Sequence, residues 1–109
     1  MPQDTLTPHR FHILVALAGR DLHGSGIVRD VLDQTGGALR LWPATLYGTL
    51  DDLENDGWIA ELADDERPEG VSGRRRYYRI TPAGRAVLTQ EAARLSAMAS
   101  VARQRLQQA

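Results

Sequence analysis

The stretch of sequence with the clearest chemistry combines arginine with tyrosine. It comprises Arg74, Arg75, Arg76, Tyr77, Tyr78 and Arg79. Guanidinium groups form bidentate hydrogen bonds with phosphate oxygens, so the three consecutive arginines could clamp the backbone of a nucleic acid. The alternative is a solvated edge strand, whose charges protect it from aggregation.

Other residues that could do chemistry lack the partners that such chemistry needs. His9 and His12 are three residues apart and His23 follows later, but no carboxylate or thiol is placed to complete a metal site. The glycines that flank Ser25 do not form a phosphate loop, and they lack the outer spacing of a nucleophile elbow. The sequence therefore indicates a protein that is not an enzyme and that uses no metal and no cofactor.

The composition indicates one small domain. The chain has 109 residues, of which 42% are hydrophobic, and it has no cysteine, so neither a disulfide framework nor a thiolate zinc site can form. A domain of this size buries about two thirds of the surface that its unfolded chain exposes, so a second subunit could add much of its stability. The longest apolar stretch, Ile13–Ala18, is too short to span a membrane. We expect a cytoplasmic protein with no membrane segment.

Charge is divided unevenly along the chain. Residues 1–66 carry four arginines and 12 acidic residues, a net charge of −8, whereas residues 67–109 carry nine arginines and two acidic residues, a net charge of +7. The basic half could face a polyanion, or the two halves could attract each other within a dimer. Composition alone leaves both interpretations open.

Hydrophobic periodicity and capping signals predict the helices. Four are expected, over residues 8–18, 24–35, 44–56 and 83–106. Thr7-Pro8 and Thr81-Pro82 each join a capping hydroxyl to a proline that suits the first helical position. Residues 38–42 alternate in part and could form a brief strand before the third helix.

A hairpin is predicted between the third and fourth helices. Residues 58–62 and 74–80 favour β-structure and flank a polar segment, which places the tip of the hairpin at 64–73. Alternation places Arg75, Tyr77 and Arg79 on one face, and Arg74, Arg76, Tyr78 and Ile80 on the other. We expect Tyr78 and Ile80 to be buried in the core.

The last predicted helix is too long for its own domain. Residues 83–106 would extend about 35 Å as a helix, further than the core of so small a domain can cover. Its apolar stripe consists of Leu88, Ala92, Leu95, Met98, Ala102 and Leu106. We expect part of this stripe to form the seam of a homodimer.

Three helices followed by a hairpin form the order of a winged helix, in which the third helix enters the DNA major groove and the hairpin grips the adjacent backbone. Three stretches of the sequence resemble the PadR family of bacterial transcriptional regulators. They are 23–27, 43–59 and 74–85. We therefore predict a mainly α (α+β) fold: a winged helix-turn-helix domain with a two-stranded β wing over 1–81, and a long C-terminal dimerisation helix over 82–109 that packs on it.

The resemblance implies a dimeric repressor that a small molecule relieves, in which Thr45 and Tyr47 lie near DNA and the final helix forms the dimer. The single final helix resembles the shorter branch of the family. The predicted DNA contacts are Ala44, Thr45, Tyr47, Gly48, Thr49, Arg74, Arg75 and Arg76. Because a two-fold dimer presents two copies of this surface, we expect an inverted-repeat site in double-stranded DNA.

Several of these side chains have a plainer interpretation. Thr45 could donate to a phosphate or simply cap its helix, and Tyr47 could bind a phosphate through its hydroxyl or lie wholly in the core. Trp42 and Trp58 bracket the same helix and are most simply core or dimer-face aromatics. A flat aromatic effector could instead stack on one of these indoles.

The third helix is also acidic. It carries no arginine and four acidic residues, Asp51, Asp52, Glu54 and Asp56, which weakens the electrostatic attraction that supplies most DNA affinity. A second hypothesis therefore stays open: a winged-helix module that binds a basic protein, with weak or no DNA binding. Steep salt dependence of binding to duplex DNA would separate the two.

Overall fold

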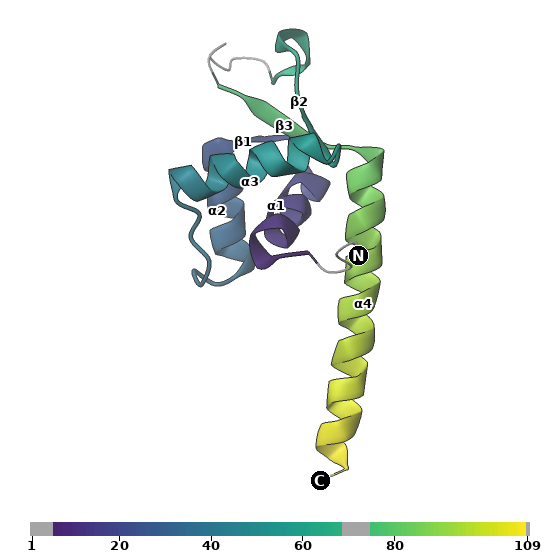
Figure 1. The fold of residues 1–109 in the computed structure, drawn as a ribbon. Coiled ribbons are helices and arrows are strands. Elements are labelled where there is room, and N and C mark those ends of the chain that lie inside the picture. The colour runs from purple at the N-terminus through teal and green to yellow at the C-terminus, as the bar shows by residue number, and fades with distance from the viewer. Residues whose placement is uncertain (1–5, 69–74, 109) are drawn as a thin grey trace.

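The computed structural model describes residues 6–68 and 75–108. Arg74 and residues 69–73 of the predicted hairpin tip therefore lie outside the described residues. The elements are α1 (Pro8–Gly19), β1 (Leu22–His23), α2 (Gly24–Gln34), α3 (Pro43–Asn55), β2 (Ile59–Glu61), a 3-10 turn (Asp64–Glu66), β3 (Tyr77–Ile80) and α4 (Pro82–Gln107). Helices α1, α2 and α3 pack together beside the sheet, and α4 passes along one side and projects well beyond them (Figure 1). This is the predicted winged-helix fold, mainly α with a small sheet.

Local capping signals explain where the helices begin. Thr7 and Thr81 each accept a hydrogen bond from the backbone N–H three residues later, at 3.4 and 3.1 Å, and a proline follows each threonine. Helix α2 starts at a different cap, because Nδ1 of His23 accepts from the Gly26 N–H at 3.0 Å. Each of the four predicted helices agrees with the structure to within one residue at both ends.

The sheet contains one strand more than the sequence predicts. Its antiparallel strands lie in the order β1-β3-β2, with Ile59 of β2 opposite Ile80 of β3. β2 and β3 are the predicted two-stranded wing, whereas β1 adds Leu22 opposite Tyr78. The possible brief strand at 38–42 does not form, because this segment is neither helix nor strand.

The core lies between α1, α2, α3 and the strands of the sheet. Its least exposed members are Ile13, Leu14, Leu17, Ile27, Val31, Leu50, Leu53 and Tyr78. Ile80 is also buried, so both residues that the sequence assigns to the core from this strand are confirmed. The three predicted helical stripes therefore meet on a single side of the sheet.

Tyr77 is buried as well as Tyr78. The sequence places this residue on the face opposite Tyr78, yet both tyrosines are buried. The ring of Tyr77 packs edge-on against His23 of β1, with 5.2 Å between the ring centroids. Burial of both residues is compatible with alternation, because strand β1, which the sequence did not predict, brings His23 against Tyr77.

Helix α4 has two different halves. Near its start, Gly84 and Glu91 are buried and Leu88 packs against the core. Further along, Leu95, Met98 and Leu106 are 40%, 52% and 77% exposed, while Ala92 and Ala102 are exposed as well. The apolar stripe thus leaves the core after about Glu91. Among the described residues, no helix has the length and apolarity needed to cross a membrane.

Candidate nucleic-acid interface

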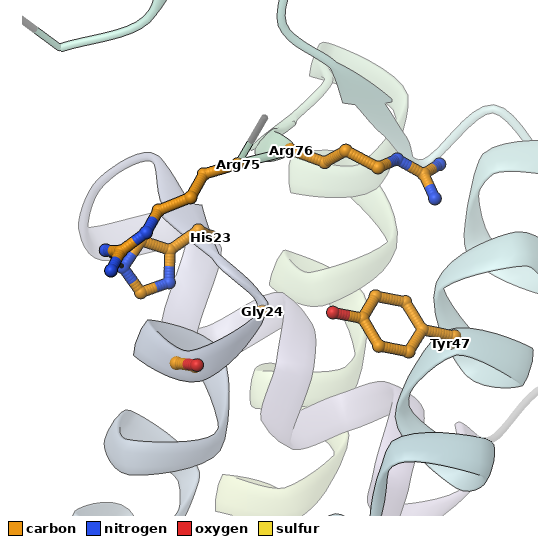
Figure 2. Close-up of a pocket in the computed structure, with 6 residues that line it drawn as sticks. His23, Gly24, Tyr47, Arg75 and Arg76 are labelled. Carbon is orange, nitrogen blue, oxygen red and sulfur yellow. Dashed lines mark hydrogen bonds between the residues drawn. The ribbon is translucent and has the colours of Figure 1, made fainter. Parts of the chain in front are cut away.

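A small cavity lies where the wing meets the start of α2 and one side of α3. It has a volume of about 250 Å³ and is lined by His23, Gly24, Ser25, Tyr47, Arg75 and Arg76. Three separate parts of the chain therefore contribute to it, and Figure 2 shows the side chains around the opening. The cavity brings together three of the predicted DNA contacts, Tyr47, Arg75 and Arg76.

The two described arginines of the run point in opposite directions. Arg75 extends over His23, with 3.1 Å between its Nη1 and Nε2 of the imidazole (Figure 2). Arg76 extends toward α3 instead, away from His23 (Figure 2). Both residues precede β3, so the predicted strand over 74–80 begins only at Tyr77 in the described residues.

Arg76 is held by carboxylates of its own chain. Its Nε and Nη2 donate to Oε1 of Glu61 at 3.2 and 3.1 Å, and Nη2 lies 3.9 Å from Oε1 of Glu54. The hydrogen bond to Glu61 raises the pKa of Arg76, while burial raises the pKa of Glu54. The guanidinium also lies 5.5 Å from the ring centroid of Tyr78. Arg76 therefore fastens the wing to α3.

Arg79 is paired in a similar way on the other side of the wing. It donates to both carboxylate oxygens of Asp21, the shortest contact being 2.8 Å, and lies 3.4 Å from Glu66. The bond to Asp21 raises the pKa of Arg79. In the described part of the wing, Arg76 and Arg79 thus have carboxylate partners. Arg75 instead contacts a histidine.

Helix α3 presents its small and polar residues to solvent. Ala44, Thr45 and Gly48 are exposed, and Tyr47 is 44% exposed, so full burial of Tyr47 in the core is wrong. Thr45 does not cap the helix, because the N-cap is Trp42 and no side chain makes the capping bond. Instead, the Thr49 hydroxyl donates to the carbonyl of Thr45 at 2.8 Å.

Close packing at Gly24 determines where the hydroxyl of Tyr47 lies. A Cβ atom at Gly24 would come within 2.7 Å of Tyr47 Oη, closer than real Cβ contacts. Because glycine has no side chain, the phenol can approach the first turn of α2 across the cavity (Figure 2). The ring of Tyr47 bridges α3 and α2 while its edge stays accessible to solvent.

Part of the acidic charge on α3 is compensated from α1. Nη1 of Arg10 donates to Asp56 at 3.0 Å, and its Nη2 lies 3.6 Å from Asp52. The sequence analysis did not identify this role for Arg10. An acidic C-terminal half in α3 could have indicated it, because such a cluster favours a nearby cation. Asp51 is exposed at the surface.

The two tryptophans lie in different surroundings. Trp42 is 63% exposed, with Arg40 4.9 Å from its ring centroid, so a place for Trp42 in the core is wrong. Trp58 packs against the core and has Arg10 5.8 Å from its ring centroid. It also lines a second cavity of about 490 Å³ between α1 and α3, together with Thr45. Trp42 does not line that cavity.

Comparison with known proteins identifies the family of this chain. The model of the transcriptional regulator PadR-like family matches residues 13–90, most of the chain. The chain belongs to the PadR family of transcriptional regulators. Over 91 residues it is 43% identical to the transcriptional regulator Rv3488 of Mycobacterium tuberculosis, covering 83% of this chain and 78% of that protein.

Solved structures share the fold of this PadR-family chain. A transcriptional regulator from Clostridium thermocellum is 27% identical, with a TM-score of 0.71 and coverage of 88% of this chain and 87% of the other. A PadR family transcription regulator from hypervirulent Clostridium difficile R20291 is 24% identical, with a TM-score of 0.74 and coverage of 92% and 99%. These likenesses agree with the winged helix described above.

In this PadR-family protein, the structure separates the predicted contacts into groups. Tyr47, Arg75 and Arg76 meet at the cavity, whereas Ala44, Thr45 and Gly48 lie on the exposed surface of α3. Arg74 lies outside the described residues. His23 is the residue at this site that the sequence analysis set aside, since it was considered only as a metal ligand. Its position directly before a predicted helix was the signal that could have identified it as a cap.

Proposed function

We propose that this PadR-family protein regulates transcription by binding duplex DNA in a sequence-specific manner, with the cavity at the start of α2 on the DNA backbone and α3 in the major groove. The single observation that carries the proposal is the convergence of Tyr47, His23 and Arg75 on one cavity beside α3. A phenol, an imidazole and a guanidinium can all donate to a phosphate oxygen.

The exposed residues of α3 are suited to a close approach. Ala44, Thr45 and Gly48 have short side chains or none, so the helix backbone can come near base edges. Thr49 is half-buried one turn further from the helix start than Thr45. In this proposal these residues influence which sequence is preferred, while Tyr47, Arg74 and Arg75 fix the position of the protein on the backbone.

We further propose that the active species is a homodimer, and that its DNA site is an inverted repeat. Large apolar side chains on the far half of α4 are exposed in the single chain, including Met98 at 52%. A groove of about 360 Å³ between α1 and α4 continues that surface. It is lined by Leu6, Pro8, Phe11, His12, Glu91, Arg94 and Leu95. A second copy of α4 would cover both the stripe and the groove.

In more detail, we propose that the protein represses transcription and that a small aromatic molecule relieves the repression. The cavity beside Trp58 supports it, because an indole offers a flat surface for stacking. Thr45 and Thr49 line the same cavity. A molecule bound there would touch the helix proposed to read DNA, and its binding would change the DNA affinity. With DNA as its partner, the protein would function in the cytoplasm.

The test is DNase protection on the region upstream of the gene, repeated across a salt series. We expect a symmetric protected region with two half-sites about one helical turn apart. Affinity should fall steeply with salt, by a slope of about 0.9 per phosphate contact. An asymmetric short site would contradict the dimer on an inverted repeat, and a flat salt dependence would contradict the backbone contacts.

A basic protein partner remains the second candidate function, and one observation favours it. Asp51 and Asp52 are exposed on α3, and Arg10 compensates Asp52 only from 3.6 Å. This acidic surface would repel phosphates and attract arginine or lysine side chains. Absence of any salt-dependent DNA binding, together with saturable binding of a basic protein, would favour this function over DNA recognition.

A further inference from the structure

Both ring nitrogens of His23 face hydrogen-bond donors. Nδ1 lies 3.0 Å from the backbone nitrogen of Gly26, and Nε2 lies 3.1 Å from Nη1 of Arg75. A peptide N–H and a guanidinium group can only donate. A neutral imidazole has one lone pair and one N–H, so it can accept from one of these donors and not from both.

The helix cap decides which nitrogen accepts. His23 is the N-cap of α2, and the Gly26 N–H belongs to the first turn, whose donors have no partner inside the helix. Nδ1 therefore accepts, and the ring proton lies on Nε2. The Nε2–H of His23 and the guanidinium of Arg75 then face each other as two donors without an acceptor.

An oxyanion is the group that satisfies both donors together. We propose that His23 Nε2–H and Arg75 jointly bind one non-bridging oxygen of a DNA backbone phosphate, an inference that rests on the proposed function. Charge-assisted hydrogen bonds of this kind are short and about twice as strong as those between neutral groups. His23 thus has two roles, because its helix cap fixes the tautomer that makes its other nitrogen a donor.

The shape of the cavity supports this assignment. Its wall at Gly24 has no side chain, and the hydroxyl of Tyr47 faces that residue from α3 (Figure 2). A free oxyanion would meet the same donors, but the Tyr47 wall comes from the helix proposed to enter the major groove. Backbone phosphates line both edges of that groove, so the cavity lies where a phosphate would be.

Arg76 supplies a comparison within the same cavity. Its guanidinium donates to Glu61 at 3.1 Å, so an acceptor of its own chain already satisfies it. Arg75 has no carboxylate among its contacts in the part of the chain that the structure describes. The phosphate contact therefore belongs to Arg75 with His23, and Arg76 positions the wing.

The decisive variant is His23→Asp, with Ser100→Asp as its matched control. Aspartate is a strong N-cap, so α2 should keep its start, but the new carboxylate would accept from Arg75 and repel a phosphate. We expect the affinity for duplex DNA to fall at least about tenfold, and the salt slope to fall by about 0.9 per protomer. Ser100→Asp adds the same charge at an exposed position of α4, far from the wing and α3, and should leave the slope unchanged.

His23→Asn tests the same contact without a new charge. Asparagine can cap with its carbonyl oxygen and donate with its amide, so affinity should stay within about threefold of the natural protein. Circular dichroism and thermal unfolding would establish that each variant is folded. Should His23→Asp fail to fold, Arg75→Ala must show the same loss of slope, and the Nε2–H proton resonance of His23 must move on DNA addition in the natural protein.

Two further results would overturn the inference. One is a His23→Asp protein that is folded and binds DNA as tightly as Ser100→Asp, with the same slope. The other is a His23 Nε2–H resonance that moves when inorganic phosphate is added but not when duplex DNA is bound, which would assign the cavity to a free oxyanion. If the natural protein binds no duplex DNA at all, the proposed function fails instead, so the two failures are distinguishable.

Discussion

The wing and the far half of α4 both extend from the three-helix body, but their chemistry is opposite. The wing carries arginines, and in the described residues Arg76 and Arg79 bind carboxylates of the same chain. The far half of α4 carries exposed apolar side chains, of which Leu106 is 77% exposed. The charged extension has partners within the chain, while the apolar extension has none among the described residues.

This difference shows how a small body can serve two external partners. Exposed ion pairs contribute about 0–1 kcal/mol each, so the wing can exchange some of its internal contacts for phosphates at little cost. Exposed apolar area is different, because water is a poor substitute for a packed neighbour and a contiguous patch usually marks an interface. The wing is thus suited to a reversible polyanion and α4 to a lasting subunit contact.

The largest effect should follow from charging the apolar extension. Replacing Leu95 and Met98 by glutamate would bury unpaired charges in a dimer, at a cost of several kcal/mol. We expect a folded monomer by analytical ultracentrifugation at micromolar concentration. The control replaces Ala93 and Ser100, exposed on the opposite side of α4, by glutamate and should stay dimeric. Equal mass for both double variants would contradict the assigned seam.

The next effect concerns the junction where α4 leaves the wing. A Cβ at Gly84 would clash with the backbone carbonyl of Trp58 and lie 2.9 Å from Ile80. Gly84→Ala should lower the free energy of unfolding by about 2–3 kcal/mol, measured by chemical denaturation. Gly48→Ala is the control, because nothing lies within 4 Å of its Cβ, and it should stabilise α3 by about 0.5–1 kcal/mol. Stabilisation by both variants would mean that α4 does not pack closely at this point.

A smaller effect should separate the arginines of the wing. Arg75→Ala should weaken binding to all DNA sequences by about tenfold and reduce the salt slope by about 0.9 per protomer. Arg76→Ala should change affinity by less than about threefold, because Glu61 already occupies this guanidinium. Fluorescence anisotropy with a specific and a random duplex would measure both. Equal losses of slope would show that the ion pair with Glu61 opens on DNA.

The smallest effect concerns Tyr78 beneath the wing. Burial raises the pKa of Tyr78 from 10.0 to about 12. The folded state therefore holds the neutral phenol, and this contribution to stability is complete below pH 10 and is lost as the pH rises toward 12. Tyr78→Phe should therefore lose less stability than the natural protein as the pH rises from 9 to 12. Thermal unfolding across this pH range would measure the difference, whose size follows from the rise in the pKa of Tyr78.

At neutral pH the same variant should change the free energy of unfolding by less than about 1 kcal/mol. The Tyr78 hydroxyl is buried without a hydrogen-bond partner in the described structure, so its removal costs little. A large loss of stability at neutral pH would indicate that the hydroxyl binds a partner in the folded protein.

Local signals in the sequence determined the helices and most of the core. Threonine followed by proline starts α1 and α4, and the spacing of Leu46, Leu50 and Leu53 defines the buried face of α3. These features depend on residues three or four apart, so they can be predicted without knowledge of the rest of the chain. The family resemblance depends on the same contiguous stretches.

Contacts between distant residues were decided only by the tertiary structure. The pairing of Leu22 with Tyr78 creates β1 and buries Tyr77, and no local pattern in either segment announces it. The same holds for Arg76, which the sequence groups with Arg75 although carboxylates from β2 and α3 surround only Arg76. Adjacent residues in an extended segment point to opposite sides, so their partners depend on which elements the fold brings to each side. For the same reason the contact of His23 with Arg75, 52 residues further along the chain, depends on the fold, whereas its cap on Gly26 is local.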